Sequence, residues 1–309
     1  MPAESAGQPA RVLGVGIATL DIINLVAAYP AEDAEVRALA QRIGRGGNAA
    51  NSLAVLRQFG HGCAWAGTLA DDAGAALIGD DFAHRGIDCR RAMRLPGTRT
   101  PTSYIAVSRA TGSRTIIHHR DLREFSARDF DAVPLAGLDW VHFEGRVPDE
   151  TAGMIARVRR ERPCLPISVE IEKPRDGIER LFCGATLLIF ARAFAEAVSA
   201  PGRVVEPSAF LRERLQGCEA EICLLPWGSE GAYGALRGGE PIFAPAHRPA
   251  SLVDTLAAGD VFNAAVIDGM LRGLELRSLL ERANRIAGHK CGRQGLDGLI
   301  DSAADAGLL

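Results

Sequence analysis

The feature that most constrains this chain is an alternation, along most of its length, between short apolar runs and longer amphipathic stretches. The short runs are rich in β-branched residues and predict strands, whereas the longer stretches predict helices. Strands that alternate with helices in this way form βαβ units around a parallel sheet. The predicted strands are 12–16, 63–68, 140–143, 167–171, 187–191 and 222–225. The predicted helices are 49–59, 73–85, 150–162, 208–216, 259–272 and 276–293. We therefore expect an α/β fold with a mostly parallel central sheet.

Four further strands have no helix between them and depart from this alternation. They are 22–28, 36–43, 103–107 and 114–118. Residues 110–113 have the composition of a hairpin turn. Together these strands predict a small antiparallel sheet, built from about 22–45 and 98–120, beside the main one. A small sheet alone leaves one apolar face uncovered, so it either closes over a ligand as a lid or pairs with a second subunit.

Composition excludes several classes of protein. Hydrophobic residues make up 47% of the chain, enough for a large core, so we exclude intrinsic disorder. The net charge of −3 creates no field that would attract nucleic acid or an anionic membrane, and charged residues interrupt each apolar run before it could span a bilayer. The arginine run at 157–162 predicts a solvated helix face rather than a binding patch.

The cysteines and the first residues carry two further predictions. Seven cysteines, an odd number without any Cys-x-x-Cys, indicate reduced thiols in a cytoplasmic protein rather than disulfides or a zinc site. Residues 1–10 are small and polar and lack the apolar core of a signal peptide, which predicts a disordered N-terminus.

Small residues precede the apolar helix predicted at 259–272 and suggest an anion hole. Ala257, Ala258 and Gly259 would leave backbone N–H groups free at the start of the helix, where the helix dipole favours an anion. Asp260 would lie beside a phosphate bound there, an arrangement that suits a carboxylate accepting a proton from an attacking hydroxyl. The alternative is an acid that merely stabilises the helix N-terminus, and this segment alone leaves both interpretations open.

A second glycine-rich element leads into the helix predicted at 49–59. Gly46 and Gly47 allow a close approach of the backbone to a ligand. Asn48 and Asn51 lie three residues apart, on one face of the first helical turn, where both amides could bind hydroxyl groups. The alternative is a tight turn with an asparagine cap.

Two aspartates flank the first strand of the predicted lid. Asp21 and Asp33 would suit sugar hydroxyls if both reached one pocket, although acids on surface loops are the more ordinary interpretation. A P-loop NTPase is excluded, because the chain has no Gly-x-x-x-x-Gly-Lys-[Ser/Thr] and neither of its two lysines, Lys173 and Lys290, follows a glycine-rich loop.

These elements resemble those of a known family. The segments 46–51 and 254–262 resemble the two signatures of the ribokinase-like (PfkB) carbohydrate kinases, over a match from about residue 12 to residue 300. The segments 142–146, 169–175 and 287–298 resemble the ketohexokinase branch. The resemblance implies a ribokinase-like α/β/α sandwich.

The implied organisation follows the family. A single domain would cover 11–301, with the β-sheet lid inserted in it, and subunits would pair through that lid as a homodimer. The partners would be a small sugar and ATP, with no nucleic acid or membrane.

The resemblance also implies an activity and roles for individual residues. The activity is ATP-dependent phosphorylation of a sugar hydroxyl with Mg²⁺, in particular of a ketohexose such as fructose to its 1-phosphate; a requirement for a monovalent cation stays open. Asp260 resembles the catalytic base, with Ala257, Ala258 and Gly259 as the anion hole. The implied substrate contacts are Asp21, Asp33, Gly46, Gly47, Asn48, Asn51 and Arg114, the last reaching the sugar or the phosphates. The implied nucleotide contacts are Trp227, Gly228, Gly231, Asn284 and Cys291.

The chain also departs from the family pattern. Ala257 replaces a glycine, Val261 a threonine and Asn284 the cysteine of ketohexokinases, and 191–194 lack the Asn-x-x-Glu of many relatives, which leaves the metal ligands unknown. Two alternatives therefore stay open. One is a kinase for ribose, 2-keto-3-deoxygluconate or a nucleoside, and the other is a sensor of sugar or nucleotide without catalysis.

Overall fold

The computed structural model describes residues 8–199 and 204–309, and within them one large sheet forms the centre of the molecule. Its strand order is β15-β14-β13-β12-β11-β10-β1-β4-β6. The strands are β1 (Arg11–Val15), β4 (Gly62–Ala66), β6 (Ile87–Asp88), β10 (Trp140–Glu144), β11 (Ile167–Ile171), β12 (Leu187–Phe190), β13 (Ile222–Pro226), β14 (Gly231–Leu236) and β15 (Ile242–Pro245). All neighbours pair in parallel except β13–β14 and β14–β15, which confirms the predicted mostly parallel sheet.

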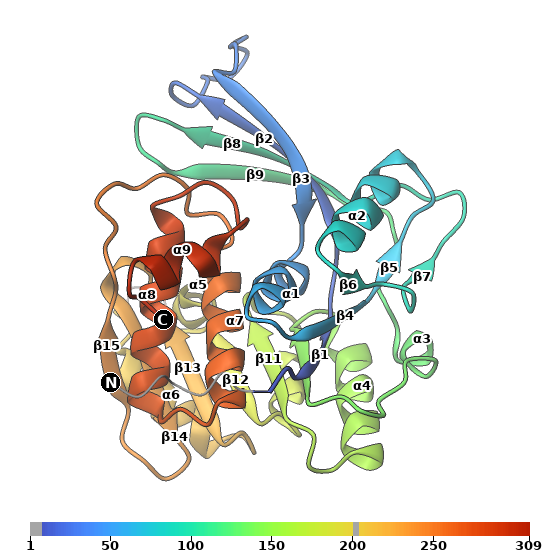
Figure 1. Ribbon diagram of the computed structural model, residues 1–309, viewed down its shortest axis with the longest axis vertical. Coiled ribbons are helices and arrows are strands. Elements are labelled where there is room, and N and C mark those ends of the chain that lie inside the picture. Colours follow the sequence, from blue (N-terminus) through green and yellow to red (C-terminus); the bar gives the residue numbers. More distant parts are fainter. Residues whose placement is uncertain (1–7, 200–203) are drawn as a thin grey trace.

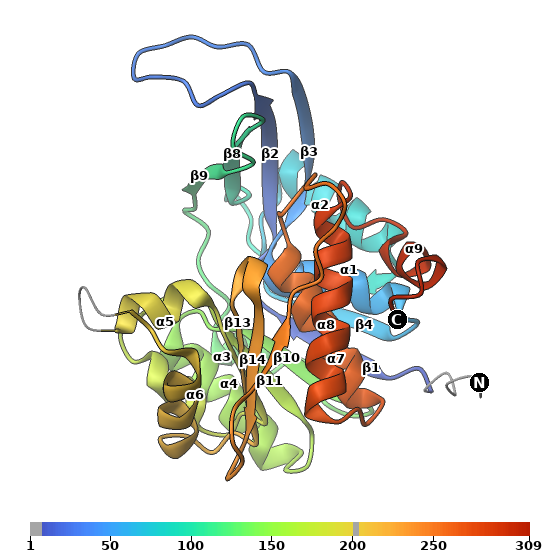
Figure 2. The ribbon, with the colours of Figure 1, turned by 90° about the vertical axis from the view of Figure 1, so that its left-hand side faces the viewer.

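Helices cover both faces of this sheet, as Figure 2 shows with the sheet seen nearly on edge. One face carries α1 (Asn48–Gln58), α7 (Ala258–Leu271), α8 (Leu276–Cys291) and α9 (Leu299–Asp305). The other carries α3 (Ala127–Phe130), α4 (Pro148–Glu161), α5 (Arg192–Val198) and α6 (Pro207–Gln216). Each face has its own buried apolar cluster, so the sheet separates two cores. This is the α/β/α sandwich that the resemblance implied.

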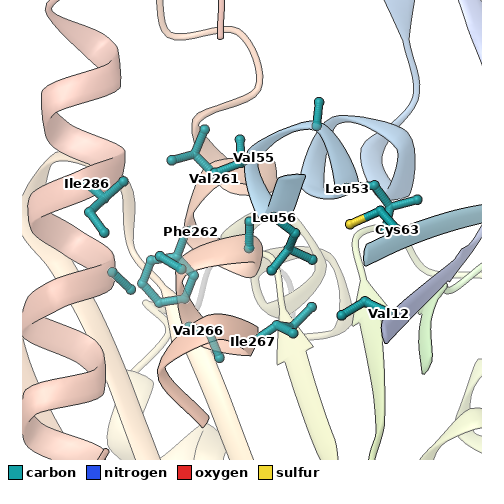
Figure 3. Close-up of a cluster of buried hydrophobic side chains, with 14 of the residues drawn as sticks. Val12, Leu53, Val55, Leu56, Cys63, Val261, Phe262, Val266, Ile267 and Ile286 are labelled. Atoms are coloured by element: carbon teal, nitrogen blue, oxygen red, sulfur yellow. The ribbon is translucent and has the colours of Figure 1, made fainter. Parts of the chain in front are cut away.

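Helix α7 lies deep in the first of these cores. Every residue from 260 to 269 is buried, because α1, α8 and the sheet surround the helix. Figure 3 shows Val12 of β1, Leu56 of α1 and Val266 and Ile267 of α7 within one cluster of buried side chains. A helix that is buried on all sides must be apolar throughout, and the two carboxylates of α7, Asp260 and Asp268, are exceptions that need an explanation.

Four strands form a second sheet, the lid, which rises from one end of the body (Figure 1). They are β2 (Thr19–Val26), β3 (Ala40–Gly46), β8 (Thr102–Ser108) and β9 (Arg114–His119), in the order β3-β2-β8-β9. The predicted small sheet is confirmed, but the prediction that it is antiparallel throughout is wrong, because β2 and β8 pair in parallel. Both of these strands run outward from the body, and each returns through its own hairpin partner.

Several short elements were not predicted. Strands β14 and β15 extend the large sheet at one edge, and their glycine- and proline-containing sequences gave no strand signal. The strand predicted at 63–68 ends at Ala66, and β5 (Thr68–Leu69) pairs instead with β7 (Met93–Arg94). Helix α2 (Ala73–His84) was predicted and packs beside β6 and the base of the lid.

The arginine run on α4 differs from its prediction. Arg159 Nε donates to the Gly184 carbonyl at 2.6 Å, and Arg162 Nη1 donates to the Leu135 carbonyl at 2.6 Å. Arg157 also binds backbone carbonyls of the segment before β10. These side chains therefore tie loops to the body by charge-assisted hydrogen bonds, and the prediction of a solvated face is wrong for these three arginines. Arg160, whose side chain is 69% exposed, is solvated as predicted.

The ordered chain begins before residue 11. Residues 1–7 of the predicted disordered terminus lie outside the described residues, but the Ala10 N–H donates to His61 Nδ1 at 3.2 Å and Ala10 is buried. Over the described ranges, no helix has both the length and the apolar character needed to cross a membrane.

Candidate active site

A cavity of about 390 Å³ lies between the lid and the body. It opens where β10 and β11 end and where α1 and α7 begin, and Ile105 and Ile116 of the lid cover it. The carboxyl ends of parallel strands are where open α/β sheets bind ligands. The cavity therefore brings together the two signature segments, which are about 200 residues apart in the sequence.

The start of α7 forms one wall of this cavity with Ala257, Ala258, Gly259 and Asp260. Ala257 is the N-cap, with φ 63° and ψ 12°, and no side chain caps the helix. A Cβ added at Gly259 would meet nothing within 4 Å, so the space above the first turn is open. The first N–H groups of a helix have no intrahelical acceptor, but here the Ala258 N–H donates to the Thr255 carbonyl at 3.3 Å. The donors that this wall offers an anion are therefore the N–H groups of Ala257 and Gly259.

Asp260 is not a capping acid. Its side chain is buried, and Asp260 Oδ2 accepts a hydrogen bond from Asn51 Nδ2 at 2.8 Å. Burial raises the pKa of Asp260 well above its ordinary value, and the negative charge of Glu170 raises it further, whereas the bond from Asn51 lowers it. A carboxylate held in this way is well suited to accept a proton.

Two further carboxylates accompany Asp260. Burial raises the pKa of Glu144 and of Glu170 to about 7. Glu144 accepts the Ala49 N–H at 2.9 Å, and Glu170 accepts the amides of Asn48 and Asn263, each at 3.0 Å. These bonds fasten the first turn of α1 and the second turn of α7 to the ends of β10 and β11.

The start of α1 forms the neighbouring wall. Gly47 has φ +109°, and a Cβ there would lie 2.1 Å from the Ile17 carbonyl oxygen, so only glycine fits. Gly47 is also the N-cap, and Asn48 donates its amide to Glu170 instead of capping the helix. The alternative of an asparagine cap is therefore wrong, and Asn48 and Asn51 both line the cavity.

The lid contributes Asp21 and Arg114 to the same cavity. Asp21 accepts the Thr19 hydroxyl at 2.8 Å, and burial raises the pKa of its carboxyl. Gly46 leaves room for this carboxylate, because a Cβ at Gly46 would lie 2.2 Å from Asp21 Oδ2. Arg114 Nη1 donates to the Thr255 hydroxyl at 3.0 Å, which joins the lid to the loop before the anion hole.

Asp254 orders that loop. Asp254 Oδ1 accepts the Leu256 N–H at 2.9 Å, and Asp254 Oδ2 lies 3.1 Å from Lys290 Nζ. Lys290 is completely buried and also donates to the Asp254 carbonyl at 2.7 Å. The other lysine, Lys173, is exposed and lines the cavity.

Asp33 is the predicted sugar contact that the structure does not bring to this cavity. It lies with φ +62° on the exposed connection between β2 and β3, whereas Asp21 lies on β2 near the body. Within one copy of the chain, the prediction that both aspartates reach one pocket is therefore wrong. The turn between the two strands carries Asp33 outward, and sequence proximity to Asp21 did not reveal this.

The predicted nucleotide residues lie outside the lining of this cavity. Trp227, Gly228 and Gly231 surround the turn between β13 and β14, and both glycines have positive φ. Trp227 is buried, and the Arg192 guanidinium lies over its ring at 4.6 Å from the centroid.

Helix α8 carries the other two residues of this set. Asn284 Nδ2 donates to the carbonyls of Ala244 and Pro245 at 2.8 and 3.1 Å, so its amide donors serve the packing of α8 on β15. The Cys291 carbonyl accepts the Val253 N–H at 2.8 Å, which places Cys291 beside the segment that leads to the anion hole.

Sequence reasoning missed Glu144, Glu170 and Arg146 as site residues, although all three line the cavity. Their signal is position: Glu144 and Arg146 follow the strand predicted at 140–143, and Glu170 is the penultimate residue of the strand predicted at 167–171. Across the described parts of the chain, no three His, Cys, Asp or Glu side chains come close enough together to hold a metal ion by themselves.

Comparison with known proteins decides the family. Residues 10–302 match the family described as pfkB family carbohydrate kinase. The chain belongs to the pfkB carbohydrate kinase family. Like other members of this family it is a carbohydrate kinase, a phosphotransferase. The ketohexokinase of Mus musculus is 37% identical to it over 297 residues, which cover 94% of this chain and 99% of that protein.

Solved structures of pfkB kinases share the fold. The ribokinase of Giardia lamblia has a TM-score of 0.83 at 14% identity, with coverage of 96% of this chain and 99% of that one. The Arabidopsis thaliana ribokinase complexed with ribose and ATP has a TM-score of 0.76 at 19% identity, with coverage of 93% and 94%. At these identities the pfkB fold is what the superpositions establish.

Proposed function

We propose that this pfkB kinase transfers the γ-phosphoryl group of ATP to a hydroxyl of a ketohexose such as fructose, giving the 1-phosphate. The observation that carries the proposal is the position of Asp260, a buried carboxylate beside the open first turn of α7 and bonded to Asn51. The similarity to the mouse ketohexokinase supports a ketohexose as the substrate.

The chemistry follows from these positions. Asp260 accepts the proton of the sugar hydroxyl, the hydroxyl oxygen forms a bond to the terminal phosphorus, and the bond from that phosphorus to the bridging oxygen breaks as ADP leaves. The N–H groups at the start of α7 stabilise the charge on the transferred group. Arg114, anchored to Thr255, adds a positive charge above the same wall.

The sugar contacts divide into donors and acceptors. Asp21 and the carbonyl of Asn48 accept hydrogen bonds from hydroxyl groups, because the Asn48 amide nitrogen is already bonded to Glu170. The Asn51 amide donates toward Asp260, at the point where the reacting hydroxyl would lie. A polyol offers both donors and acceptors and matches this arrangement.

The nucleotide would extend from the anion hole toward Trp227, Gly228, Gly231 and Cys291. Mg²⁺ prefers oxygen ligands and is held in kinases by one or two carboxylates together with substrate phosphates. Glu172 fits this requirement, because its exposed carboxylate lines the cavity. When bound, the ion would neutralise charge on the phosphates; residues 257–260 would position the transferred group.

The test is ATP consumption by the purified protein with a panel of ketoses, aldoses, sugar acids and nucleosides, with Asp260→Asn as the control. We expect turnover with a ketohexose and formation of the 1-phosphate, both lost in the variant. Turnover confined to ribose or nucleosides would contradict the ketohexose assignment. Sugar binding without turnover of any compound would favour a sensor.

We also propose that two copies pair through the outer face of the lid. Ile43, Ile22, Tyr104 and Ile117 lie opposite one another in register across all four strands, and Ile43, Tyr104 and Ile117 are 53%, 49% and 68% exposed. A second copy of this chain would cover this apolar row. Light scattering after size exclusion should give about twice 32.8 kDa, and Ile117→Asp should give a monomer. A wild-type monomer would contradict this proposal.

A further inference from the structure

The amide of Asn51 lies between a buried cation and a buried carboxylate. Arg45 Nη1 donates to Asn51 Oδ1 at 3.0 Å, and Asn51 Nδ2 donates to Asp260 Oδ2 at 2.8 Å. The Arg45 side chain, at the end of β3, is only 2% exposed. The chain Arg45–Asn51–Asp260 therefore runs from the base of the lid to the proposed catalytic carboxylate.

Arg45 is itself held firmly. Its Nε donates to Asp81 Oδ2 at 2.5 Å, and its guanidinium lies over the Phe82 ring, 5.3 Å from the centroid. Asp81 is shared with Arg85, whose Nε donates to Asp81 Oδ1 at 2.9 Å. Helix α2 thus fixes Arg45 from behind, away from the cavity that holds the substrate.

The chemistry of a guanidinium settles which way the Asn51 amide faces. An arginine side chain has only donors, whereas an asparagine amide has one oxygen that accepts and one nitrogen that donates. Because Arg45 occupies the oxygen, the nitrogen must face Asp260. If the amide turned over, its oxygen would face the ionised carboxylate and repel it.

We propose that Arg45 is a positioning residue for phosphoryl transfer, which acts by fixing the Asn51 amide so that it donates to Asp260. The inference rests on the proposed function for the role of Asp260 as the base, but the juxtaposition of the three side chains does not depend on which sugar is phosphorylated. Asn48 offers a contrast. A buried anion, Glu170, accepts a hydrogen bond from the amide nitrogen of Asn48, whereas a buried cation, Arg45, donates to the amide oxygen of Asn51.

The surroundings of Asp260 make this bond consequential. The charged groups that act on Asp260 are Glu170 at the end of β11, Glu144 at the end of β10 and Glu172 just beyond β11, all of which disfavour its ionised form. Arg45 on β3 is the cation that acts in the other direction, and Asn51 supplies the hydrogen bond. If the Asn51 donor were lost, the negative charges of the three glutamates would act on Asp260 without the hydrogen bond that opposes them.

The test compares Arg45→Met with Arg85→Met, a matched control that removes the other arginine on Asp81 and leaves Asn51 untouched. An NMR titration of the Asp260 carboxyl carbon, assigned by its loss in Asp260→Asn, measures the effect without any assay of activity. We expect the midpoint to move to higher pH in Arg45→Met and to stay at the wild-type value in Arg85→Met. In Arg45→Lys, which keeps a cationic donor, it should return toward the wild-type value.

Activity provides the second readout. The acid limb of kcat should move to higher pH in Arg45→Met, with the rate below the limb falling about tenfold for each pH unit of displacement. Asn51→Asp keeps a partner for Arg45, but it removes the donor and adds a negative charge beside Asp260, so it should move the limb in the same direction and further than Arg45→Met does. An unchanged Asp260 titration in Arg45→Met would overturn the proposal, whatever its effect on stability. A shifted titration in a protein that phosphorylates no sugar would overturn only the proposed function.

Discussion

Helix α7 carries two buried carboxylates eight residues apart, and their surroundings are opposite in character. Asp260, 6% exposed, has one amide donor from Asn51 and three neighbouring glutamates. Asp268, 0% exposed, lies 2.9 Å from His61 Nε2, 2.9 Å from Arg272 Nε and 2.6 Å from Arg282 Nη2. Burial raises the pKa of both side chains, but at Asp268 the bonds and charges of these partners outweigh it and the pKa is lowered.

The comparison teaches that burial alone does not mark a functional acid. Asp268 joins α7 to α8 and to the turn before β4, and its charge is compensated by its partners. Asp260 faces a cavity, and the charges nearest to it disfavour its ionised form. A group that holds its charge at a cost to stability is the one to expect at a catalytic site.

The sharpest test of this contrast is Asp260→Asn. Loss of a general base costs about 10²–10⁴ in rate, so kcat should fall by that factor. The melting temperature should stay the same or rise, because the variant removes a carboxylate that burial and its neighbours destabilise. Steady-state kinetics and calorimetry measure the two effects. A folded variant with near wild-type kcat would remove Asp260 from the mechanism.

Asp268→Asn should show the reverse pattern. Removal of one partner from a buried ionic cluster costs about 3–5 kcal/mol, so the free energy of unfolding should fall by that amount. The kcat of the folded fraction should change little, because the cavity lining does not include Asp268. Urea denaturation together with assays at low temperature checks both points. Full stability in this variant would mean that the cluster contributes nothing.

The dependence of stability on pH separates the two regions further. The folded protein binds more protons at Glu144 than the unfolded chain does between the ordinary pKa of 4.5 and the folded value of about 7. This group therefore lowers the free energy of unfolding as the pH rises through that window, by up to about 1.4 kcal/mol per unit. Asp268 does the opposite, since its stabilising contribution is present above pH 3.8 and is lost as the pH falls through its lowered pKa.

We expect Glu144→Gln to flatten the decline between pH 4.5 and 7. Denaturation midpoints across this window measure the slope, and the same series on Asp268→Asn should keep it. A slope in Glu144→Gln equal to that of the wild type would show that this carboxyl does not titrate there.

The smallest effect is expected at the start of α7. Ala257 has φ 63°, a left-handed conformation that costs a residue with a Cβ about 1–2 kcal/mol. Ala257→Gly should therefore raise the free energy of unfolding by about 0.5–1 kcal/mol with little loss of kcat, as differential scanning calorimetry can test. Ala258→Gly, one residue further into the helix, is the matched control and should lower it. Equal changes in both variants would exclude the backbone explanation.

Periodicity and composition predicted the architecture well, because alternating strands and helices leave few alternatives to a parallel sheet. The parallel pairing of β2 with β8 and the edge strands β14 and β15 depend on long-range contacts that no local pattern encodes. Within the site, Asp260, Asn48 and Asn51 were predicted because each belongs to a short local element. Glu144 was missed because it meets that element only in the folded chain. Arg45 lies six residues before Asn51, but its burial against Asp81 of α2 arises only in the folded chain.

The two lysines differ in whether a reagent in solution can reach their amines. Lys290 is sealed inside the protein against Asp254, whereas Lys173 stands at the rim of the substrate cavity. Besides the N-terminal amine, an amine-reactive ester therefore has Lys173 as its accessible side-chain target on the native fold, and the two labels fall on different peptides. Protection of the Lys173 amine in peptide mass spectra would then measure ligand occupancy directly.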